Sequence, residues 1–352
     1  MSNKTNTHRK SQEVWALLSW VMITAILLSS CGQAQQSRKV YKVGILSGLG
    51  AFAPAVEGFK NKMAELGYVE GENITYDLQS TNVDFDAYKS ITEKFVADKV
   101  DMIFAFPTEA ALEAKAATQG TDIPVVFTLA FTDVEGVSLI DTVRQPGGNI
   151  TGVRFQSNEI ASRRLQILLE MAPLAKRIFV PYLEGYPNVP GQLNVLHQMA
   201  ASQNVELFEY AATSPQDLET ELNSFMLSND VVRIQAILLI AEPVSLTPDF
   251  YAVLSKFSYE HKIPIGGAPM SVGVSEMSIE GDQASMFGIL PDAKFAGEQA
   301  ATLADKIFRG TPAGTIPVLT SDYFFQINYK ATQALGVIVP DSLLRQADEI
   351  IR

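Results

Sequence analysis

A glycine-rich loop at residues 48–53 is the first stretch whose residue types and spacing could do chemistry. The apolar run from Val43 to Leu46 leads into Gly48-Leu49-Gly50, and Ala53 stands where helical spacing begins. Strand, G-x-G-x-x-A and helix is the order of a dinucleotide-binding fingerprint, in which a helix start holds a pyrophosphate. Asp77, in the next expected strand, would then bind the ribose. One hypothesis is therefore an exported NAD-dependent oxidoreductase.

Two features of the loop weaken that hypothesis. Phe52 and Pro54 place bulk and rigidity where a pyrophosphate would approach the backbone, and a fingerprint of this kind is a weak signal by itself. Open α/β sheets bind their ligands beyond the carboxyl ends of their strands. The loop can therefore equally form one wall of a cleft for a different ligand.

Other catalytic patterns are missing from the sequence. His8, His197 and His261 are the three histidines, and they have no metal-ligand spacing. The sequence contains neither a G-x-S-x-G elbow nor a Walker A lysine after a glycine-rich loop. We therefore expect a binding protein rather than an enzyme, with no catalytic residue, no metal and no cofactor.

The N-terminus is patterned for export. Basic residues precede an apolar stretch from Val14 to Leu28, which ends in Leu28-Ser29-Ser30-Cys31. At about 15 residues the stretch is short for a membrane span, which needs roughly 20, and suits a signal peptide. Small residues before Cys31, the only cysteine, resemble a bacterial lipobox. We expect a signal peptide over residues 1–30, a lipid on Cys31 and a tether over residues 31–38; a signal anchor with an incidental cysteine is the alternative.

Length and charge limit the remaining classes. A chain of 352 residues is too long for one ordinary core, so two domains are expected. The net charge of -12 argues against nucleic acid as a partner, because phosphate binding needs a basic face. We expect a monomer in the extracytoplasmic space, held at a bacterial membrane by its lipid.

Short apolar runs alternate with helical spacing along the whole chain. This order predicts an α/β fold with two successive doubly wound units of mostly parallel strands. Residues 150–155 are interpreted as a strand that leads away from the first sheet. The last strands and helices, at 285–290, 293–309, 323–327 and 329–335, must complete the earlier sheets. The chain therefore crosses between two lobes more than once, which builds a hinge.

Ligand-binding side chains are expected where the strands of both lobes end. Thr108 is a candidate N-cap for the following helix, and N–H groups at helix starts would suit a carboxylate of the ligand. Glu242 suits an ammonium group, although a solvated loop carboxylate is an equal alternative. Core packing explains some of the aromatic residues as well as a pocket does. The candidates are Ser47, Gly48, Leu49, Gly50, Phe52, Phe106, Thr108, Glu109, Phe127 and Thr128 on one wall, and Tyr182, Tyr186 and Glu242 on the other.

Several long segments resemble a known family. EGFKNKMAELGYVEGENITYDLQ, KVDMIFAFPTEAALEAKAATQGTDIPVVF, RQPGGNITGV and INYKATQALGVIVPDSLL are similar, in order, to bacterial ABC-transporter substrate-binding proteins associated with tryptophan and tyrosine uptake. A position that usually reads Gly-Thr-Pro in that family reads Pro107-Thr108-Glu109 here. The family often has an aspartate where Glu242 stands.

The resemblance implies a type I periplasmic-binding-protein fold, with two Rossmann-like lobes joined by a multi-strand hinge. The first lobe would hold residues 39–148 plus about 283–312, and the second residues 149–282 plus about 313–345. A solute, with an aromatic or branched amino acid as first candidate, would bind between the lobes and pass to an ABC permease with its ATPase. The alternative within this fold is a sensor that serves a membrane receptor.

Overall fold

The computed structural model describes residues 39–81, 84–132, 138–226, 232–267 and 285–352. The predicted signal peptide, the lipid site at Cys31 and the tether lie outside the described residues. Residues 41–352 form one compact unit, which is the body discussed below. No helix in the described ranges is long and apolar enough to cross a membrane.

The first lobe is built on a six-stranded parallel sheet in the order β11-β5-β4-β3-β1-β2. Its central strands are apolar runs with few exposed residues, as expected for a parallel sheet covered on both faces. Separate apolar clusters lie against the two faces. The strands are β1 (Tyr41–Ser47), β2 (Ile74–Ser80), β3 (Met102–Phe106), β4 (Val125–Phe131), β5 (Ile150–Phe155) and β11 (Leu319–Thr320). The helices are η1 (Gly50–Phe52), α2 (Pro54–Glu65), α3 (Phe85–Ala97), α4 (Thr108–Ala117), α9 (Ala293–Phe308) and η3 (Ala313–Thr315).

The second lobe contains a four-stranded sheet, β7-β6-β8-β9, and a three-stranded sheet, β10-β12-β13. A parallel bridge between Gly267 and Gly288 connects them. The strands are β6 (Arg177–Leu183), β7 (Glu206–Ala212), β8 (Ala236–Leu238), β9 (Ile265–Gly266), β10 (Phe287–Pro291), β12 (Tyr323–Asn328) and β13 (Glu349–Ile351). The helices are α5 (Ser157–Met171), α6 (Val189–Gln203), α7 (Pro215–Ser224), η2 (Pro243–Ser245), α8 (Pro248–His261), α10 (Tyr329–Ala334) and α11 (Asp341–Leu344).

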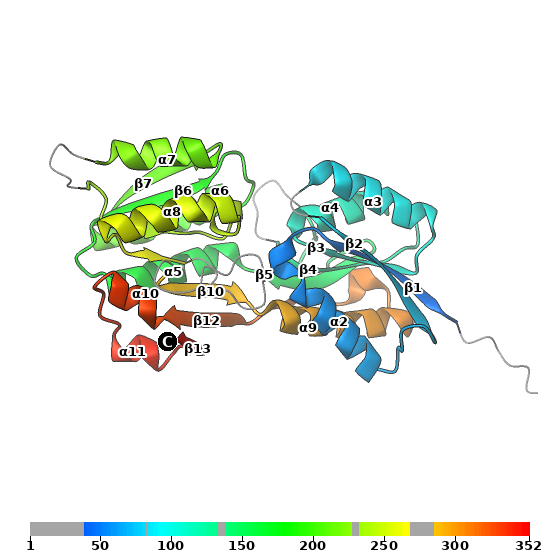
Figure 1. The fold of residues 1–352 in the computed structure, drawn as a ribbon. Coiled ribbons are helices and arrows are strands. Elements are labelled where there is room, and N and C mark those ends of the chain that lie inside the picture. Colours follow the sequence, from blue (N-terminus) through cyan, green and yellow to red (C-terminus); the bar gives the residue numbers. More distant parts are fainter. Residues whose placement is uncertain (1–38, 82–83, 133–137, 227–231, 268–284) are drawn as a thin grey trace, which may run out of the picture. The chain divides into compact units, whose positions relative to one another are not determined.

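The chain passes three times between the two groups of elements (Figure 1). It leaves the first sheet from β5 into α5, returns from β10 into α9, and leaves again from β11 into β12. The expectation that residues 150–155 lead away from the first sheet was wrong, because β5 pairs with β4 on one side and β11 on the other. Residues of about 283–312 were expected in the first lobe. Within this range β10 pairs with β12 in the second lobe, whereas α9 packs on α2 in the first.

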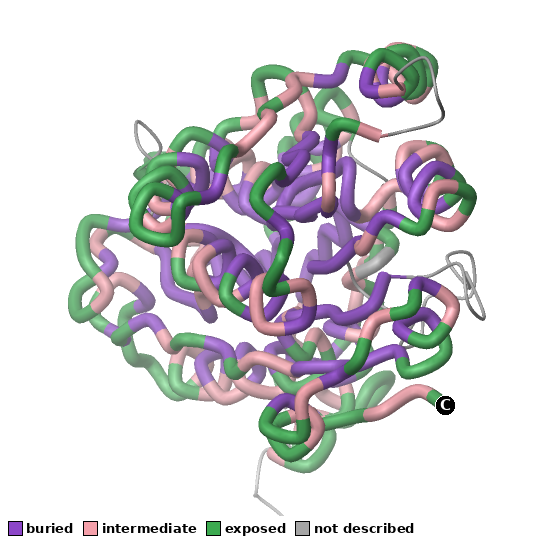
Figure 2. The backbone as a smooth tube through the Cα atoms, turned by 90° about the vertical axis from the view of Figure 1, so that its left-hand side faces the viewer, coloured by how far each residue is buried: buried purple, intermediate pink, exposed green. Residues whose placement is uncertain are grey.

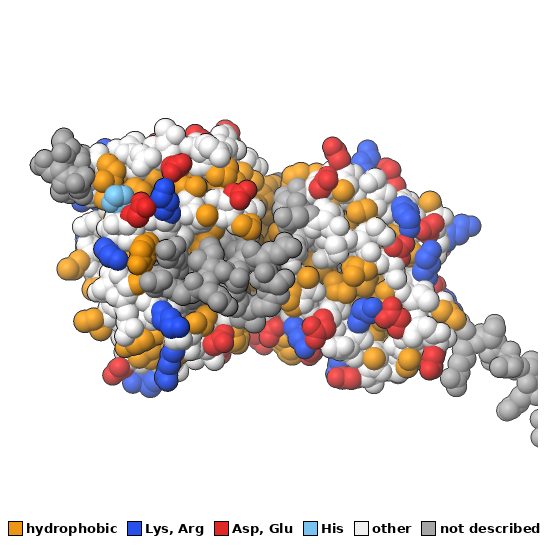
Figure 3. Space-filling model, viewed as in Figure 1, with side chains coloured by type: hydrophobic (Ala, Val, Ile, Leu, Met, Phe, Trp, Pro, Cys, Tyr) orange, Lys and Arg blue, Asp and Glu red, His pale blue; other side chains and the backbone are white. Residues whose placement is uncertain are grey.

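The predicted α/β architecture with two lobes is confirmed. Figure 2 shows buried segments through the centre of the body and exposed helical turns outside. Acidic and basic side chains are mixed on the face drawn in Figure 3. Asp77, the candidate ribose ligand, lies 2.7 Å from Lys94 Nζ, and this pairing holds the pKa of the Asp77 carboxyl below its ordinary value. Its side chain is therefore already engaged in a surface ion pair.

Candidate functional site

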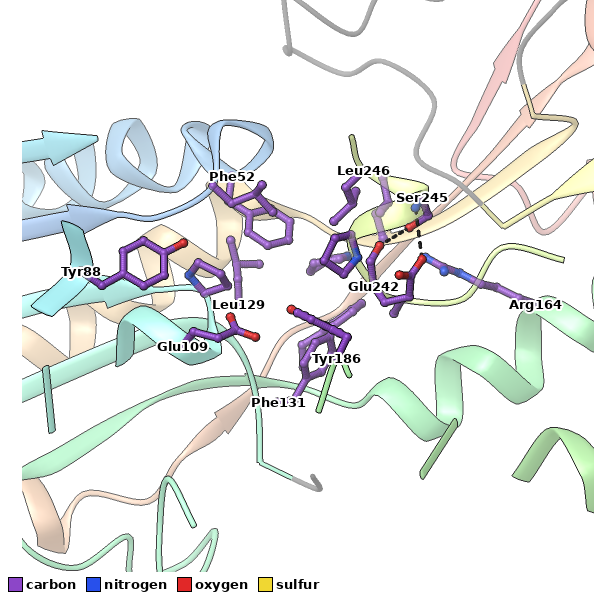
Figure 4. Close-up of a pocket in the computed structure, with 17 residues that line it drawn as sticks. Phe52, Tyr88, Glu109, Leu129, Phe131, Arg164, Tyr186, Glu242, Ser245 and Leu246 are labelled. Atoms are coloured by element: carbon purple, nitrogen blue, oxygen red, sulfur yellow. Dashed lines mark hydrogen bonds between the residues drawn. The ribbon is translucent and has the colours of Figure 1, made fainter. Parts of the chain in front are cut away.

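A pocket lies at the strand ends, with walls from both lobes (Figure 4). Most of its lining is aromatic or aliphatic, and a few polar side chains converge on it, as in sites for small organic ligands. The first lobe contributes Leu49, Phe52, Tyr88, Pro107, Glu109, Leu129, Phe131 and Phe155. The second contributes Arg164, Tyr186, Ala241, Glu242, Pro243, Ser245, Leu246, Leu290 and Pro291.

A bulge at the end of β4 shapes the apolar wall. The pairing between β4 and β5 shifts between Phe127 and Ala130, and Leu129 has a φ of 51°. A bulge re-aims the side chains that follow it, and a positive φ is uncommon for a leucine. Leu129 and Phe131 thus both reach the pocket. The rings of Phe131 and Phe155 lie 5.7 Å apart there.

Glu242 is the acid at the second-lobe wall. Its carboxylate accepts N–H bonds from Leu183 at 2.9 Å, Val244 at 3.0 Å and Ser245 at 3.2 Å. The side chain N-caps η2 and is 2 % exposed, so the alternative of a solvated loop carboxylate is wrong. Burial raises the pKa of Glu242 to about 7, although its N–H bonds and Arg164 oppose the rise. The group is thus a buried acid that a cation would stabilise in its charged form.

Arg164 was not among the predicted residues. Its Nη1 donates to the Leu239 carbonyl at 3.0 Å and its Nη2 to the Ile289 carbonyl at 2.8 Å. Burial lowers the pKa of Arg164 to about 9, while the charge of Glu242 opposes that shift. The position falls in register with buried residues of α5 such as Ile160 and Leu168. A cation in the apolar stripe of a helix was the sequence signal that could have found it.

Glu109 and Tyr186 meet across the pocket from opposite lobes. In Figure 4 the Tyr186 hydroxyl points toward the Glu109 carboxylate. Burial raises the pKa of Glu109, opposed by its own backbone N–H and by Tyr186. Burial also raises the pKa of Tyr186, and the charges of Glu109 and Glu242 add to that rise. Glu109, Tyr186 and Glu242 therefore act on one another as one polar group in an apolar pocket.

The structure brings Leu49, Phe52, Glu109, Tyr186 and Glu242 together at the pocket, and other candidates lie outside its lining. Ser47 is buried. The buried Phe106 ring packs in the apolar cluster on one face of the first-lobe sheet, 5.3 Å from the ring of Phe104. Phe127 belongs to the cluster on the other face of that sheet. The buried Thr128 hydroxyl has no hydrogen-bond partner among the described residues. Tyr182 packs against the second-lobe core.

Thr108 has a different role from the predicted one. Pro107, not Thr108, occupies the N-cap position of α4. The Thr108 hydroxyl instead accepts the N–H of Phe131 at 2.9 Å. The bond ties the start of α4 to the end of β4, and so it positions the ring of Phe131 at the pocket. Thr108 supports the wall without lining it.

The glycine-rich loop serves ring packing. The Tyr88 hydroxyl donates to the Gly48 carbonyl at 2.6 Å, and a Cβ on Gly48 would lie 2.8 Å from the Tyr88 ring. A Cβ on Gly50 would meet nothing within 4 Å. Gly48 therefore allows the Tyr88 side chain, which lines the pocket, to pack closely against the loop.

Among the described residues, no group of three His, Cys, Asp or Glu side chains could hold a metal ion.

Gly48→Ala is expected to destabilise the protein by about 1–3 kcal/mol, because the added methyl group forces Tyr88 out of its place. Thermal unfolding of the purified protein measures the effect, with Gly50→Ala as the matched control in the same loop. Equal unfolding midpoints for the two variants would contradict the packing role of Gly48.

Comparison with known proteins adds the family. The chain matches the model for ABC transporter substrate binding proteins over residues 43–351. It is 30% identical over 326 residues to the tyrosine-binding protein of Clostridioides difficile (strain R20291), a match that covers 89% of each protein.

Solved structures share the fold. A conserved domain protein from Vibrio cholerae has a TM-score of 0.75 at 22% identity, covering 89% of this chain and 100% of that one. An ABC domain from Streptococcus pneumonia in complex with L-Trp has a TM-score of 0.74 at 19% identity, with the same coverage. An open, ligand-free substrate-binding protein with adhesive properties from Clostridium difficile has a TM-score of 0.66 at 26% identity, covering 89% of this chain and 99% of that one.

Proposed function

This chain belongs to the ABC transporter substrate-binding protein family, and we propose that it captures a small solute between its lobes for an ABC importer. Members of this family bind solutes for transporters and are not enzymes. The observation that carries the proposal is the pocket itself, an apolar cavity with Glu109 from one lobe and Glu242 from the other. No catalytic role is proposed for either acid.

The solute that we propose carries an amine and an apolar or aromatic body. Glu242 would hold the amine, and the rings of Phe52, Phe131 and Phe155 would pack against the body. An aromatic or branched amino acid meets this description and is the first candidate. Two relatives support it, since one is called a tyrosine-binding protein and another contains L-Trp.

Capture would use the three connections between the lobes as a hinge. A ligand that contacts both walls favours the closed arrangement of the lobes, because the ligand makes contacts there that it lacks when the lobes are open. Glu109 and Tyr186 face each other from the same two walls. The partners would be an ABC permease and its ATPase, reached from the outer side of a bacterial membrane. A lipid on Cys31 would hold the protein at that membrane. The protein itself would be a monomer.

Uptake by cells tests the importer role. Deleting the gene is expected to reduce uptake of radiolabelled aromatic or branched amino acids or of aromatic amines, and the wild-type gene should restore it. Glu242→Ala should not restore uptake, whereas Glu93→Ala, which changes an exposed acid of α3, should. If uptake is normal without the gene while a transcriptional response to the same solutes is lost, the sensor alternative replaces the importer.

A further inference from the structure

The pocket offers a ligand more hydrogen-bond acceptors than donors. The hydroxyl of Tyr88 donates to the Gly48 carbonyl at 2.6 Å, and that of Tyr186 points toward the Glu109 carboxylate. Ser245 donates its N–H to the Glu242 carboxylate at 3.2 Å and its hydroxyl to the Glu242 carbonyl at 2.7 Å. The donors of Tyr88 and Ser245 are therefore already engaged. A carboxylate has roughly four acceptor positions, so the two acids retain capacity for a ligand that donates.

The guanidinium of Arg164 is poorly placed to receive a ligand carboxylate. Arg164 is 1 % exposed, and both Nη atoms are bonded to backbone carbonyls. Only its Nε lacks a partner among the described residues. In the view of Figure 4, Glu242 lies between Glu109 and Arg164. The positive charge of Arg164 therefore offsets the negative charge of Glu242 on the side away from Glu109. The described lining residues include no second Lys or Arg that could offset the charge of Glu109.

The start of α4 already carries an acid. N–H groups at a helix start commonly hold an anion, and the sequence favoured this place for a ligand carboxylate. Glu109 is the second residue of α4, so an acid of the chain itself stands in the first turn of this helix. The protein thus supplies the anion at this helix start from its own chain.

We propose that the ligand is an organic amine with a net positive charge, whose ammonium group bonds to Glu109 and Glu242 while its apolar body packs on the rings. This inference rests on the proposed solute-binding function, and it replaces the amino acid named there as first candidate by an amine with the same kind of apolar body. An amine should consequently bind more tightly than the amino acid with the same side chain, because the α-carboxylate adds negative charge to an acidic, donor-poor pocket.

The electrostatics of the empty pocket agree with this inference. Burial raises the pKa of both Glu109 and Glu242, since each charged form lacks enough compensation. A ligand cation supplies that compensation to both, whereas a zwitterion adds an anion beside them. Tyr186 lies close enough to both acids for their charges to raise the pKa of its hydroxyl.

Calorimetric titration of the purified protein at pH 8 tests the proposal with three matched pairs: phenethylamine and phenylalanine, tyramine and tyrosine, tryptamine and tryptophan. We expect at least one amine to bind ten-fold or more tightly than its amino acid. Glu109→Gln should weaken amine binding about ten-fold and reduce the preference, while Glu93→Gln, the same charge change on exposed α3, should leave both unchanged. Thermal unfolding verifies that each variant is folded.

The outcomes separate this inference from the function on which it rests. If an amino acid binds as tightly as its amine or more tightly, the inference is overturned and the solute-binding function stands. The same holds if the six compounds fail but a sugar or another neutral solute raises the unfolding midpoint. If no solute binds, both fail. If the amine preference persists in Glu109→Gln, the inference is overturned for Glu109.

Discussion

Glu242→Ala is expected to weaken binding of an amine-bearing ligand by about 2–5 kcal/mol, the range for removing one partner of a buried charged pair. The carboxylate lies in a fully buried position and organises the N–H groups of Leu183, Val244 and Ser245. Removing it also leaves the Arg164 guanidinium buried without its counter-charge. Calorimetric titration at pH 8 measures the loss. Unchanged affinity in a folded Glu242→Ala protein would place the amine elsewhere.

The same group makes ligand binding depend on pH. The pKa of Glu242 is about 7 in the free protein, and a bound cation favours the charged form and lowers that pKa. Binding therefore releases protons, and affinity should rise as pH increases from 6 to 8. Glu109, whose pKa is also raised, acts in the same direction, while Arg164 stays charged through this range and the raised pKa of Tyr186 keeps its hydroxyl protonated. Titrations between pH 5.5 and 8.5 would contradict this account if affinity were flat.

Gly297→Leu is expected to lower the free energy of unfolding by about 3 kcal/mol or more, at or beyond the upper end for overpacking. A Cβ on Gly297 would lie 2.1 Å from the Ala55 carbonyl oxygen, and one on Gly58 would lie 2.0 Å from the Lys294 carbonyl oxygen. These are backbone atoms, so the side chain fits only if α2 and α9 separate. Because α9 follows the crossing from β10, the variant should also loosen the connection between the lobes.

Thermal unfolding measures this effect as a fall in midpoint of several degrees or more. Lys306→Leu is the matched control, since it adds the same side chain at an exposed position of α9. A Gly297→Leu protein with the midpoint of the wild type would show that the two helices are not held together by close backbone approach.

Burial on both faces explains why the first lobe could be predicted from sequence. β3 and β4 are nearly unbroken apolar runs, which is the pattern of parallel strands covered on both faces. The sheet to which β5 belongs could not be predicted in the same way. A buried strand looks the same in either lobe, and its pairing with β4 and β11 is decided by tertiary contacts.

The sequence indicated the loops that line the pocket, but only some of the side chains in its lining. Of the residues expected at strand ends, Glu109, Tyr186 and Glu242 lie in that lining. Phe106 and Phe127 were expected at the pocket wall, yet their rings pack in the apolar clusters on the two faces of the first-lobe sheet. Leu129 reaches the pocket through a bulge, which shifts the two-residue alternation of a strand and leaves no trace in residue types.

The capture of a small solute in the pocket is most directly tested by thermal unfolding of the purified protein with amino acids, amines, sugars and NAD. A ligand at 100 times its dissociation constant adds about 2.7 kcal/mol, a shift of several degrees. We predict that an aromatic or branched amine or amino acid raises the midpoint of the wild type but not of Glu242→Ala. Stabilisation by NAD alone would contradict the account and make the glycine-rich loop a phosphate site after all.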